Sequence, residues 1–317
     1  MDKILVTGGA GFIGSNFVHH LINETSSTVI NLDKLTYAGN LNNIRDVRRE
    51  KRHKFVRGDI GNVRLVNSLV RKVDAVVNFA AESHVDRSIR TPQVFTETNV
   101  LGTHVLLGAC QRFGVKFEQI STDEVYGSRV EGSFRETDPL NPSSPYSASK
   151  AAAELLVNSY YVTYGLDVSV TRSTNNYGPN QHPEKLIPKL ITNALRGRPL
   201  PIYGTGRNIR DWIFVEDNCR AIRLVLERGK KGQVYNIAGG TEKKNFEIAR
   251  EILACLSLPE TLMQFVEDRP GHDFRYSVDC TKMHSLGWRP KVTFGEGMQR
   301  TIDWYTRNDW WWRGLVE

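Results

Sequence analysis

The chain has 317 residues, 40% of them hydrophobic and 24% charged, as expected for a globular protein with one large domain or two closely packed ones. No apolar run approaches the roughly 18 residues that a membrane span needs, and the N-terminus lacks a signal-peptide layout. The four cysteines are far apart and form no CxxC pair, which indicates reduced thiols in a cytoplasmic protein, without a metal site. The net charge of +7 suits a small anionic substrate, and no nucleic-acid-binding motif accompanies it.

Strand and helix patterns alternate through the first half of the chain. Strands are expected in KILVTGG, STVINLD, HKFVRGDI, DAVVNFAAES, VKFEQIST and LDVSVTRSTN, and helices in FIGSNFVHHLINE, TETNVLGTHVLLGACQRF and from Tyr146 to about Tyr164. Repeated strand–helix–strand units with short linkers predict a parallel sheet with helices on both faces, a Rossmann-type doubly wound α/β fold.

The pattern changes from about Asn175, where Pro and Gly become frequent and short helix and strand pieces alternate. This indicates a smaller α/β substrate-binding lobe interleaved with the last strands of the sheet. We assign residues 1–174 with about 202–237 to a dinucleotide-binding domain, and about 175–201 with 238–317 to the smaller lobe.

The stretch TGGAGFIG follows the first strand and opens the first helix. Gly8, Gly11 and Gly14 permit a tight turn and close approach of the backbone to a pyrophosphate, which the helix N-terminus would bind. Asp33 ends the second strand 19 residues after Gly14, where a carboxylate would hold a ribose 2′-hydroxyl. The carboxylate favours NAD over NADP, although Lys34 beside it weakens that argument. A glycine turn without any ligand is the alternative.

The stretch PYSASK places Tyr146 four residues before Lys150, so both side chains share one helix face. A free tyrosine is a poor base at neutral pH, but a nearby ammonium and an oxidised nicotinamide would favour the phenolate. The pair can therefore accept a proton from a hydroxyl group while hydride leaves the same carbon. A YxxxK pattern without the other motifs would more often be chance or a surface pair.

The stretch ISTDEVYG sets Asp123 and Glu124 at the end of a buried strand, where an unpaired carboxylate is costly. Adjacent residues of a regular strand point to opposite faces, so the backbone must leave strand geometry around Asp123 if both are to reach one substrate. A solvated surface pair is the alternative.

These motifs resemble those of the extended short-chain dehydrogenase/reductase family, and within it the nucleotide-sugar 4,6-dehydratases. The resemblance runs essentially end to end. It is carried by TGGAGFIGSNF, NLDKLTYAGNL, AAESHVDRSI, ISTDEVYG, SPYSASKAAAE, NNYGPNQHPEKLIP, LPIYGTGRNIRDWIFVED, YNIAGGTEKKN and DRPGHDFRY. Similar 4-epimerases share the glycine cradle and YxxxK but have small or neutral residues in place of the Asp-Glu pair.

The resemblance implies a lyase that converts dTDP-glucose to dTDP-4-keto-6-deoxyglucose and water with tightly bound NAD. It implies that Tyr146, with Lys150, takes the 4-hydroxyl proton, while Thr122 orients that hydroxyl. Glu124 would remove the proton on carbon 5, and Asp123 would protonate the departing 6-hydroxyl. A 4-epimerase, a dehydratase of UDP- or CDP-glucose, and a non-catalytic NAD-binding protein remain alternatives.

The resemblance also implies the remaining site residues. The expected cofactor contacts are Gly8, Gly11, Phe12, Ile13, Gly14, Asp33, Lys34, Thr36, Asp59, Ile60, Ala80, Ala81, Ser83, Thr98, Tyr146, Lys150 and Asn176. The expected substrate contacts are Ser83, Thr122, Asn175, Lys185, Leu186, Pro201, Tyr203, Arg210, Asn245, Arg269 and His272. A homodimer through a four-helix interface, built from the helices at 97–113 and 146–164, is implied as well. The segment 128–144 is shorter than in many similar proteins, which leaves open how the site is covered.

Overall fold

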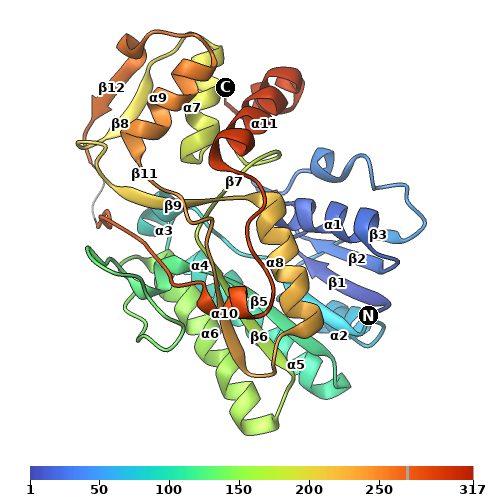
Figure 1. The fold of residues 1–317 in the computed structure, drawn as a ribbon. Coiled ribbons are helices and arrows are strands. Elements are labelled where there is room, and N and C mark those ends of the chain that lie inside the picture. The colour runs from blue at the N-terminus through green and yellow to red at the C-terminus, as the bar shows by residue number, and fades with distance from the viewer. Residues whose placement is uncertain (269–270, 317) are drawn as a thin grey trace.

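The computed structural model describes residues 1–268 and 271–316, and its centre is a seven-stranded parallel sheet (Figure 1). The strand order is β10-β6-β5-β4-β1-β2-β3. The strands are β1 (Lys3–Thr7), β2 (Thr28–Asp33), β3 (His53–Arg57), β4 (Ala75–Asn78), β5 (Lys116–Thr122), β6 (Val168–Ser173) and β10 (Gln233–Ile237). Because the order reverses between β1 and β4, their carboxyl ends leave a crevice there, which is where doubly wound folds bind ligands. The predicted Rossmann-type fold is confirmed.

Helices cover both faces of this sheet. One apolar core lies under α1 (Phe12–Glu24) and α8 (Val215–Arg228), and the other under α2 (Val63–Val70), α5 (Thr103–Phe113) and α6 (Pro145–Tyr164). Apart from the edge strand β3, the strands are largely buried on both sides, which is why they read as continuous apolar runs in the sequence. Short helices α3 (Val85–Arg90) and α4 (Gln93–Phe95) connect β4 to the helices on the second face.

The second lobe has its own apolar core and two small sheets, and it lies above the carboxyl edge of the main sheet in Figure 1. One sheet contains β11 (Glu242–Lys244), β9 (Ile209–Phe214) and β7 (Asn175–Tyr177), and the other contains β12 (Met263–Val266) and β8 (Leu200–Tyr203). Its helices are α7 (Leu186–Leu195), α9 (Asn245–Cys255), α11 (Phe294–Arg307) and α12 (Asp309–Trp312), while α10 (Thr281–Ser285) packs near β10.

The interleaving of the two lobes is visible in the segment 202–237. It contributes α8 and β10 to the large domain, whereas β8 and β9, which fall at its start, pair within the small sheets. The exact division into two domains at the boundaries given above stays a prediction.

Helix α6 begins and ends where its sequence specifies. Ser144 and Ser147 form a capping box, Pro145 occupies the first turn, and Gly165 ends the helix in the left-handed conformation with φ 61°. This fixes the start of the helix that carries Tyr146 and Lys150.

The helix expected over 96–113 has two parts. Residues Thr96–Gly102 form a π-helical segment, η2, before α5 continues. In η2, the side-chain amide of Asn99 donates to the Glu82 carbonyl at 3.0 Å and its oxygen accepts from the Glu82 N–H at 2.9 Å. Such segments are frequent at functional sites, and this one fixes the backbone that follows β4.

Tryptophans anchor the end of the chain to the large domain. Trp311 and Trp312 are buried, and Trp310 is half exposed. The Trp311 indole N–H donates to the Asn43 side-chain oxygen at 2.8 Å, and the Asn43 amide donates to the Ala10 carbonyl at 2.9 Å. The last helix is therefore linked through Asn43 to the glycine-rich turn after β1.

Among residues 1–268 and 271–316, no helix combines the length and the apolar character needed to cross a membrane.

Candidate active site

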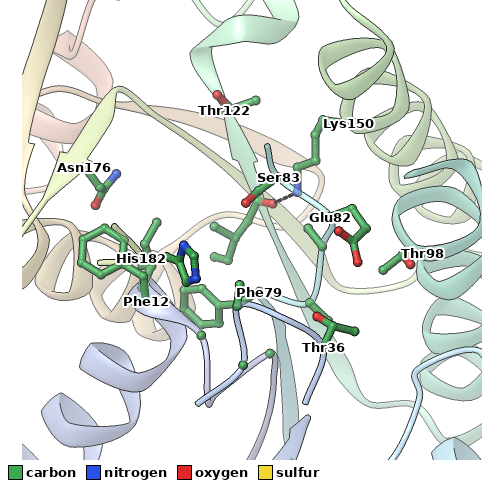
Figure 2. Close-up of a pocket in the computed structure, with 18 of the residues that line it drawn as sticks. Phe12, Thr36, Phe79, Glu82, Ser83, Thr98, Thr122, Lys150, Asn176 and His182 are labelled. Carbon is green, nitrogen blue, oxygen red and sulfur yellow. Dashed lines mark hydrogen bonds between the residues drawn. The ribbon is translucent and has the colours of Figure 1, made fainter. Parts of the chain in front are cut away.

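A large pocket opens at the carboxyl ends of β1, β2, β4, β5 and β6, between the two lobes (Figure 2). Of the predicted site residues it collects Gly8, Gly11, Phe12, Ile13, Asp33, Lys34, Thr36, Asp59, Ile60, Ala80, Ala81, Ser83, Thr98, Thr122, Asp123, Glu124, Tyr146, Lys150, Asn175, Asn176 and Lys185. Figure 2 shows Thr122 and Lys150 at one end of the pocket, and Phe12, Phe79 and His182 at the other. All five predicted catalytic residues thus share one cavity with the glycine-rich turn.

The glycine-rich turn leaves no room for side chains where it passes the end of β4. Gly8 has φ +69°, and a Cβ there would lie 2.6 Å from the Ala80 backbone nitrogen. A Cβ on Gly14 would lie 2.3 Å from the Gly8 carbonyl oxygen. Gly14 does not line the pocket; it lets α1 pack against the turn. A backbone cradle of this kind at a helix N-terminus fits a pyrophosphate group.

Asp33 is held in place by the backbone around it. Its two carboxylate oxygens accept from the N–H of Ala10 at 2.9 Å and of Leu35 at 2.7 Å. Leu35 has φ +59°, a conformation rare outside glycine, and the bond to Asp33 supports it. Lys34 pairs with Asp59 at 2.7 Å, so it does not neutralise Asp33. The Asp33 carboxylate therefore faces the pocket with a fixed orientation.

The backbone leaves strand geometry directly after Thr122, as expected. Residues Asp123–Tyr126 form a 3-10 turn, η3, and Gly127 ends it with φ 79°. The Thr122 hydroxyl accepts from the Glu124 N–H at 3.3 Å and donates to Asp123 Oδ1 at 3.2 Å. This turn brings both carboxyl groups to the same cavity, which a continued strand could not do.

Asp123 occupies the interior of the protein and is only 2% exposed. Burial first, and then the Glu124 charge, raise the pKa of Asp123 well above its ordinary value, against an opposing effect of Arg210. Its Oδ2 has no hydrogen-bond partner among the described residues. A protonated carboxyl group with an unused oxygen beside the cavity can donate a proton to a substrate.

Tyr146 and Lys150 are both buried, and burial shifts the pKa of each. Burial and the charges of Glu124 and Asp123 raise the pKa of Tyr146, while a hydrogen bond with Thr122 lowers it. Burial lowers the pKa of Lys150 to about 8, and its Nζ donates to the Ile120 carbonyl at 2.5 Å. In the protein alone, burial and the carboxyl groups of η3 oppose the phenolate, and the expectation that the Lys150 ammonium and an oxidised nicotinamide together favour it stays a prediction.

The remaining predicted substrate residues belong to the second lobe and do not line this pocket. They are Leu186, Pro201, Tyr203, Arg210, Asn245 and His272, while Arg269 lies outside the described residues. The Tyr203 and His272 rings meet edge to face, with centroids 6.4 Å apart. Arg210 is buried, and its guanidinium donates to the Asp273 carbonyl at 2.9 Å. These residues remain a predicted set for the nucleotide part of the substrate.

The structure also adds residues to the pocket that the sequence did not indicate. One of them is Glu184, whose Oε1 accepts from the hydroxyl of Tyr37 at 2.9 Å; Tyr37 itself lies between the lining residues Thr36 and Ala38 at the rim, and the Arg87 guanidinium carbon lies 3.6 Å from its ring centroid. Lys185 Nζ donates to the Ser83 carbonyl at 2.8 Å. The other unpredicted lining residues are Leu32, Ala38, Gly39, Gly58, Phe79, Glu82, Ile120, Ser121, Ser173, Thr174, Gln181 and His182. The motif NNYGPNQHPEKLIP contains Gln181, His182 and Glu184, but only its residues Asn175, Asn176, Lys185 and Leu186 are predicted from the sequence.

The segment 128–144 packs beside the catalytic turn. The Asn141 N–H donates to the Val125 carbonyl at 3.0 Å, and the Phe134 N–H donates to the Ser277 carbonyl at 2.9 Å. The Phe134 ring stacks on Tyr126 with centroids 4.8 Å apart. This short segment therefore connects η3 to the C-terminal part of the chain.

Comparison with known proteins decides the family. The sequence model of the family described as GDP-mannose 4,6 dehydratase matches residues 5–301. The chain belongs to this family. Its members fall within the extended short-chain dehydrogenase/reductases, as the sequence motifs indicated.

Relatives across this dehydratase family match nearly the full length. The low-salt glycan biosynthesis protein Agl12 of Haloferax volcanii is 52% identical, over 96% of this chain and 99% of its own. A dTDP-glucose 4,6-dehydratase of Streptomyces antibioticus is 51% identical, over 99% and 95%. The crystal structure of DesIV, a dTDP-glucose 4,6-dehydratase from Streptomyces venezuelae with NAD bound, superposes with a TM-score of 0.97 at 51% identity, covering 99% of both chains.

Proposed function

We propose that the protein is a lyase that converts dTDP-glucose to dTDP-4-keto-6-deoxyglucose and water with tightly bound NAD. One observation carries the proposal: the turn after β5 brings the buried Asp123 and the half-buried Glu124 into the same cavity as Tyr146 and Lys150. The relatives named dTDP-glucose 4,6-dehydratase, about half identical over almost the whole chain, support the substrate and the reaction.

The cofactor-binding part of the proposal rests on the glycine-rich turn and Asp33. The turn and the N-terminus of α1 would hold the pyrophosphate, and Asp33 a ribose hydroxyl, with Lys150 and Asn176 at the nicotinamide end. When bound, NAD accepts hydride from carbon 4 of the sugar and returns it to carbon 6. The remaining predicted cofactor residues would complete the contacts along the same pocket.

The chain supplies the proton transfers. Tyr146 takes the proton of the 4-hydroxyl, Thr122 hydrogen-bonds that hydroxyl, and Lys150 supplies positive charge. Because the pKa of Tyr146 is raised in the protein, the positive charge of oxidised nicotinamide is needed to make its phenolate accessible. Removal of the 4-hydroxyl proton by Tyr146 therefore requires that oxidised NAD is bound.

The two carboxyl groups carry the elimination. The 4-ketone acidifies the proton on carbon 5, which Glu124 removes as a base, while Asp123 protonates the departing 6-hydroxyl. Carbon 5 is reprotonated when the hydride returns to carbon 6. The raised pKa of Asp123 supports its role as the acid, because a general acid must hold its proton at working pH.

Residues of both lobes would bind the nucleotide sugar. Ser83, Asn175 and Lys185, which line the pocket, would contact the sugar. Tyr203 and Arg210 belong to the set in the second lobe that would receive the nucleotide and its diphosphate, together with Leu186, Pro201, Asn245, Arg269 and His272.

We further propose a cytoplasmic homodimer. Leu101 of η2 and Leu155 and Val162 of α6 are 57%, 64% and 71% exposed, and an apolar helix face of this kind suits a four-helix interface. Leu155→Asp should shift the protein from dimer to monomer in sedimentation velocity, whereas an unchanged sedimentation coefficient would remove this surface from consideration.

The test of the function is a product assay with dTDP-glucose deuterated at carbon 4, without added NAD, read by mass spectrometry. Loss of water with deuterium on carbon 6 is expected, because the hydride is shuttled within one active site. Conversion to a galactose nucleotide without change of mass would mean a 4-epimerase and leave Asp123 and Glu124 unexplained. Parallel assays with UDP-glucose and CDP-glucose determine the base preference.

A further inference from the structure

A buried ion pair lies directly behind the catalytic turn. Glu154 of α6 and Arg172 of β6 are each 5% exposed, and Arg172 Nε donates to Glu154 Oε2 at 2.9 Å. A second guanidinium nitrogen donates to the same oxygen at 2.5 Å. A buried ion pair contributes little net stability, because desolvation offsets the attraction between the charges. Its position therefore calls for an explanation other than stability.

The pair holds both ends of the segment that carries the proton-transfer groups. Ser121, directly before Thr122, donates its hydroxyl hydrogen to Glu154 Oε1. Tyr126, the last residue of η3, accepts at its hydroxyl oxygen from Arg172 Nη1 at 2.6 Å. Thr122, Asp123 and Glu124 lie between these two residues. The segment that carries them is thus held at both ends by hydrogen bonds to one ion pair.

Tyr126 and Arg172 also contact other strands of the large domain. The Tyr126 hydroxyl donates to the Asn236 side-chain oxygen on β10 at 2.8 Å, and the Arg172 guanidinium carbon lies 4.6 Å from the Tyr126 ring centroid. Arg172 lies opposite Ser121 in the register between β5 and β6. These contacts fix the position of the turn relative to β6, β10 and α6.

Glu154 also connects the turn to the oxidation pair. It lies four residues after Lys150 on α6, and its charge raises the pKa of Lys150 against the effect of burial. Tyr146 and Lys150 are held by their own contacts, the capped start of α6 and the bond from Lys150 to the Ile120 carbonyl. Loosening the ion pair would thus move the turn more than it moves the oxidation pair.

We infer that Glu154 and Arg172 are positioning residues for the elimination step, which fix the Asp123–Glu124 turn relative to Tyr146 and Lys150. The inference rests on the proposed dehydratase function. Acid and base catalysis depend steeply on placement, and a displacement of about 1 Å can cost about 100-fold in rate. The ion pair is the contact on which this placement depends.

The test is Glu154→Gln, which keeps the shape and the acceptor oxygen for Ser121 but removes the charge that holds Arg172. At a pH well below 8, where Lys150 keeps its proton, oxidation at carbon 4 should proceed within a fewfold of the parent rate, and elimination should slow by about 10- to 100-fold. Reduced nicotinamide should therefore accumulate on the enzyme during turnover, visible by its near-ultraviolet absorbance. Tyr126→Phe, which removes only the hydroxyl that Arg172 contacts, should shift the balance in the same direction.

A matched control separates positioning from stability. Asp217 of α8 is fully buried and accepts from the Val292 N–H at 2.9 Å, and it does not line the active-site pocket. Asp217→Asn should lower the unfolding temperature without accumulation of reduced nicotinamide.

Two results would overturn the inference. One is Glu154→Gln slowing both steps equally, and the other is Tyr126→Phe turning over without reduced nicotinamide if Glu154→Gln does not fold. Failure of the parent protein to turn over dTDP-glucose would instead refute the proposed function.

Discussion

Replacing Asp123 with Asn tests the assignment of the elimination acid most directly. The carboxamide has nearly the same shape, and its oxygen can still accept the hydrogen bond that Thr122 gives to Asp123 Oδ1 at 3.2 Å. Asp123 is buried with a raised pKa, so the native group is neutral over a range of pH where an exposed aspartate is charged. The substitution therefore removes an acidic proton from the site while changing its charge little.

The expected effect falls on one step. General acid catalysis contributes about 100- to 10,000-fold, so the elimination barrier should rise by about 3 to 5 kcal/mol. Oxidation at carbon 4 should be as fast as in the parent, because a neutral Asp123 and a neutral Asn leave the charge beside Tyr146 unchanged. Reduced nicotinamide should form at once and then persist.

Stopped-flow absorbance of reduced nicotinamide, followed by mass analysis of quenched product, measures both steps in one experiment. Asp303→Asn on α11, whose side chain is 46% exposed, is a control that should behave as the parent. Turnover of Asp123→Asn at the parent rate would refute the reasoning, and so would loss of oxidation together with elimination in a folded protein.

Three further predictions concern the cofactor pocket. Gly8→Ala should destabilise the protein by about 3 kcal/mol and abolish retention of NAD through purification, because φ is +69° and the Cβ would meet Ala80; denaturant unfolding and cofactor content test this. Oxidation should fall above pH about 8 as Lys150 loses its proton. The pKa of Lys150 is lower in the folded protein than in the unfolded chain. The free energy of unfolding of the parent protein should therefore rise by about 3 kcal/mol between pH about 8 and 10.5, and that of Lys150→Met should lack this rise. Equal pH profiles of the unfolding free energy in the two proteins would contradict this. Tyr37→Phe removes the bond to Glu184 across the rim and should speed exchange of bound NAD for labelled NAD about tenfold, whereas an unchanged exchange rate would show that this contact does not retain the cofactor.

Much of the site was predictable because local chain geometry determines it. The glycine-rich turn, Asp33 at the end of β2, and the pair Tyr146 and Lys150 each depend on spacing along one element, and the structure brings all of them to the pocket. The departure from strand geometry at Asp123 followed from the alternation of side chains along a strand.

The features that escaped prediction depend on contacts between distant segments. The bond between Tyr37 and Glu184 joins residues 147 positions apart, and nothing near either one indicates the other. The raised pKa of Tyr146 depends on burial and on the carboxyl groups of η3, which the spacing of residues within α6 does not indicate. Spacing predicts which groups meet on one element, whereas their desolvation is set by the whole fold.

The link from Trp311 through Asn43 to Ala10 has a consequence for the order in which the enzyme matures. The glycine-rich turn is made early in synthesis, but one of its supports is attached to the last helix, near the end of the chain. A nascent chain that still lacks this helix has the complete cofactor motif without this support. Stable loading of NAD is therefore expected only after residues up to Trp311 have been translated.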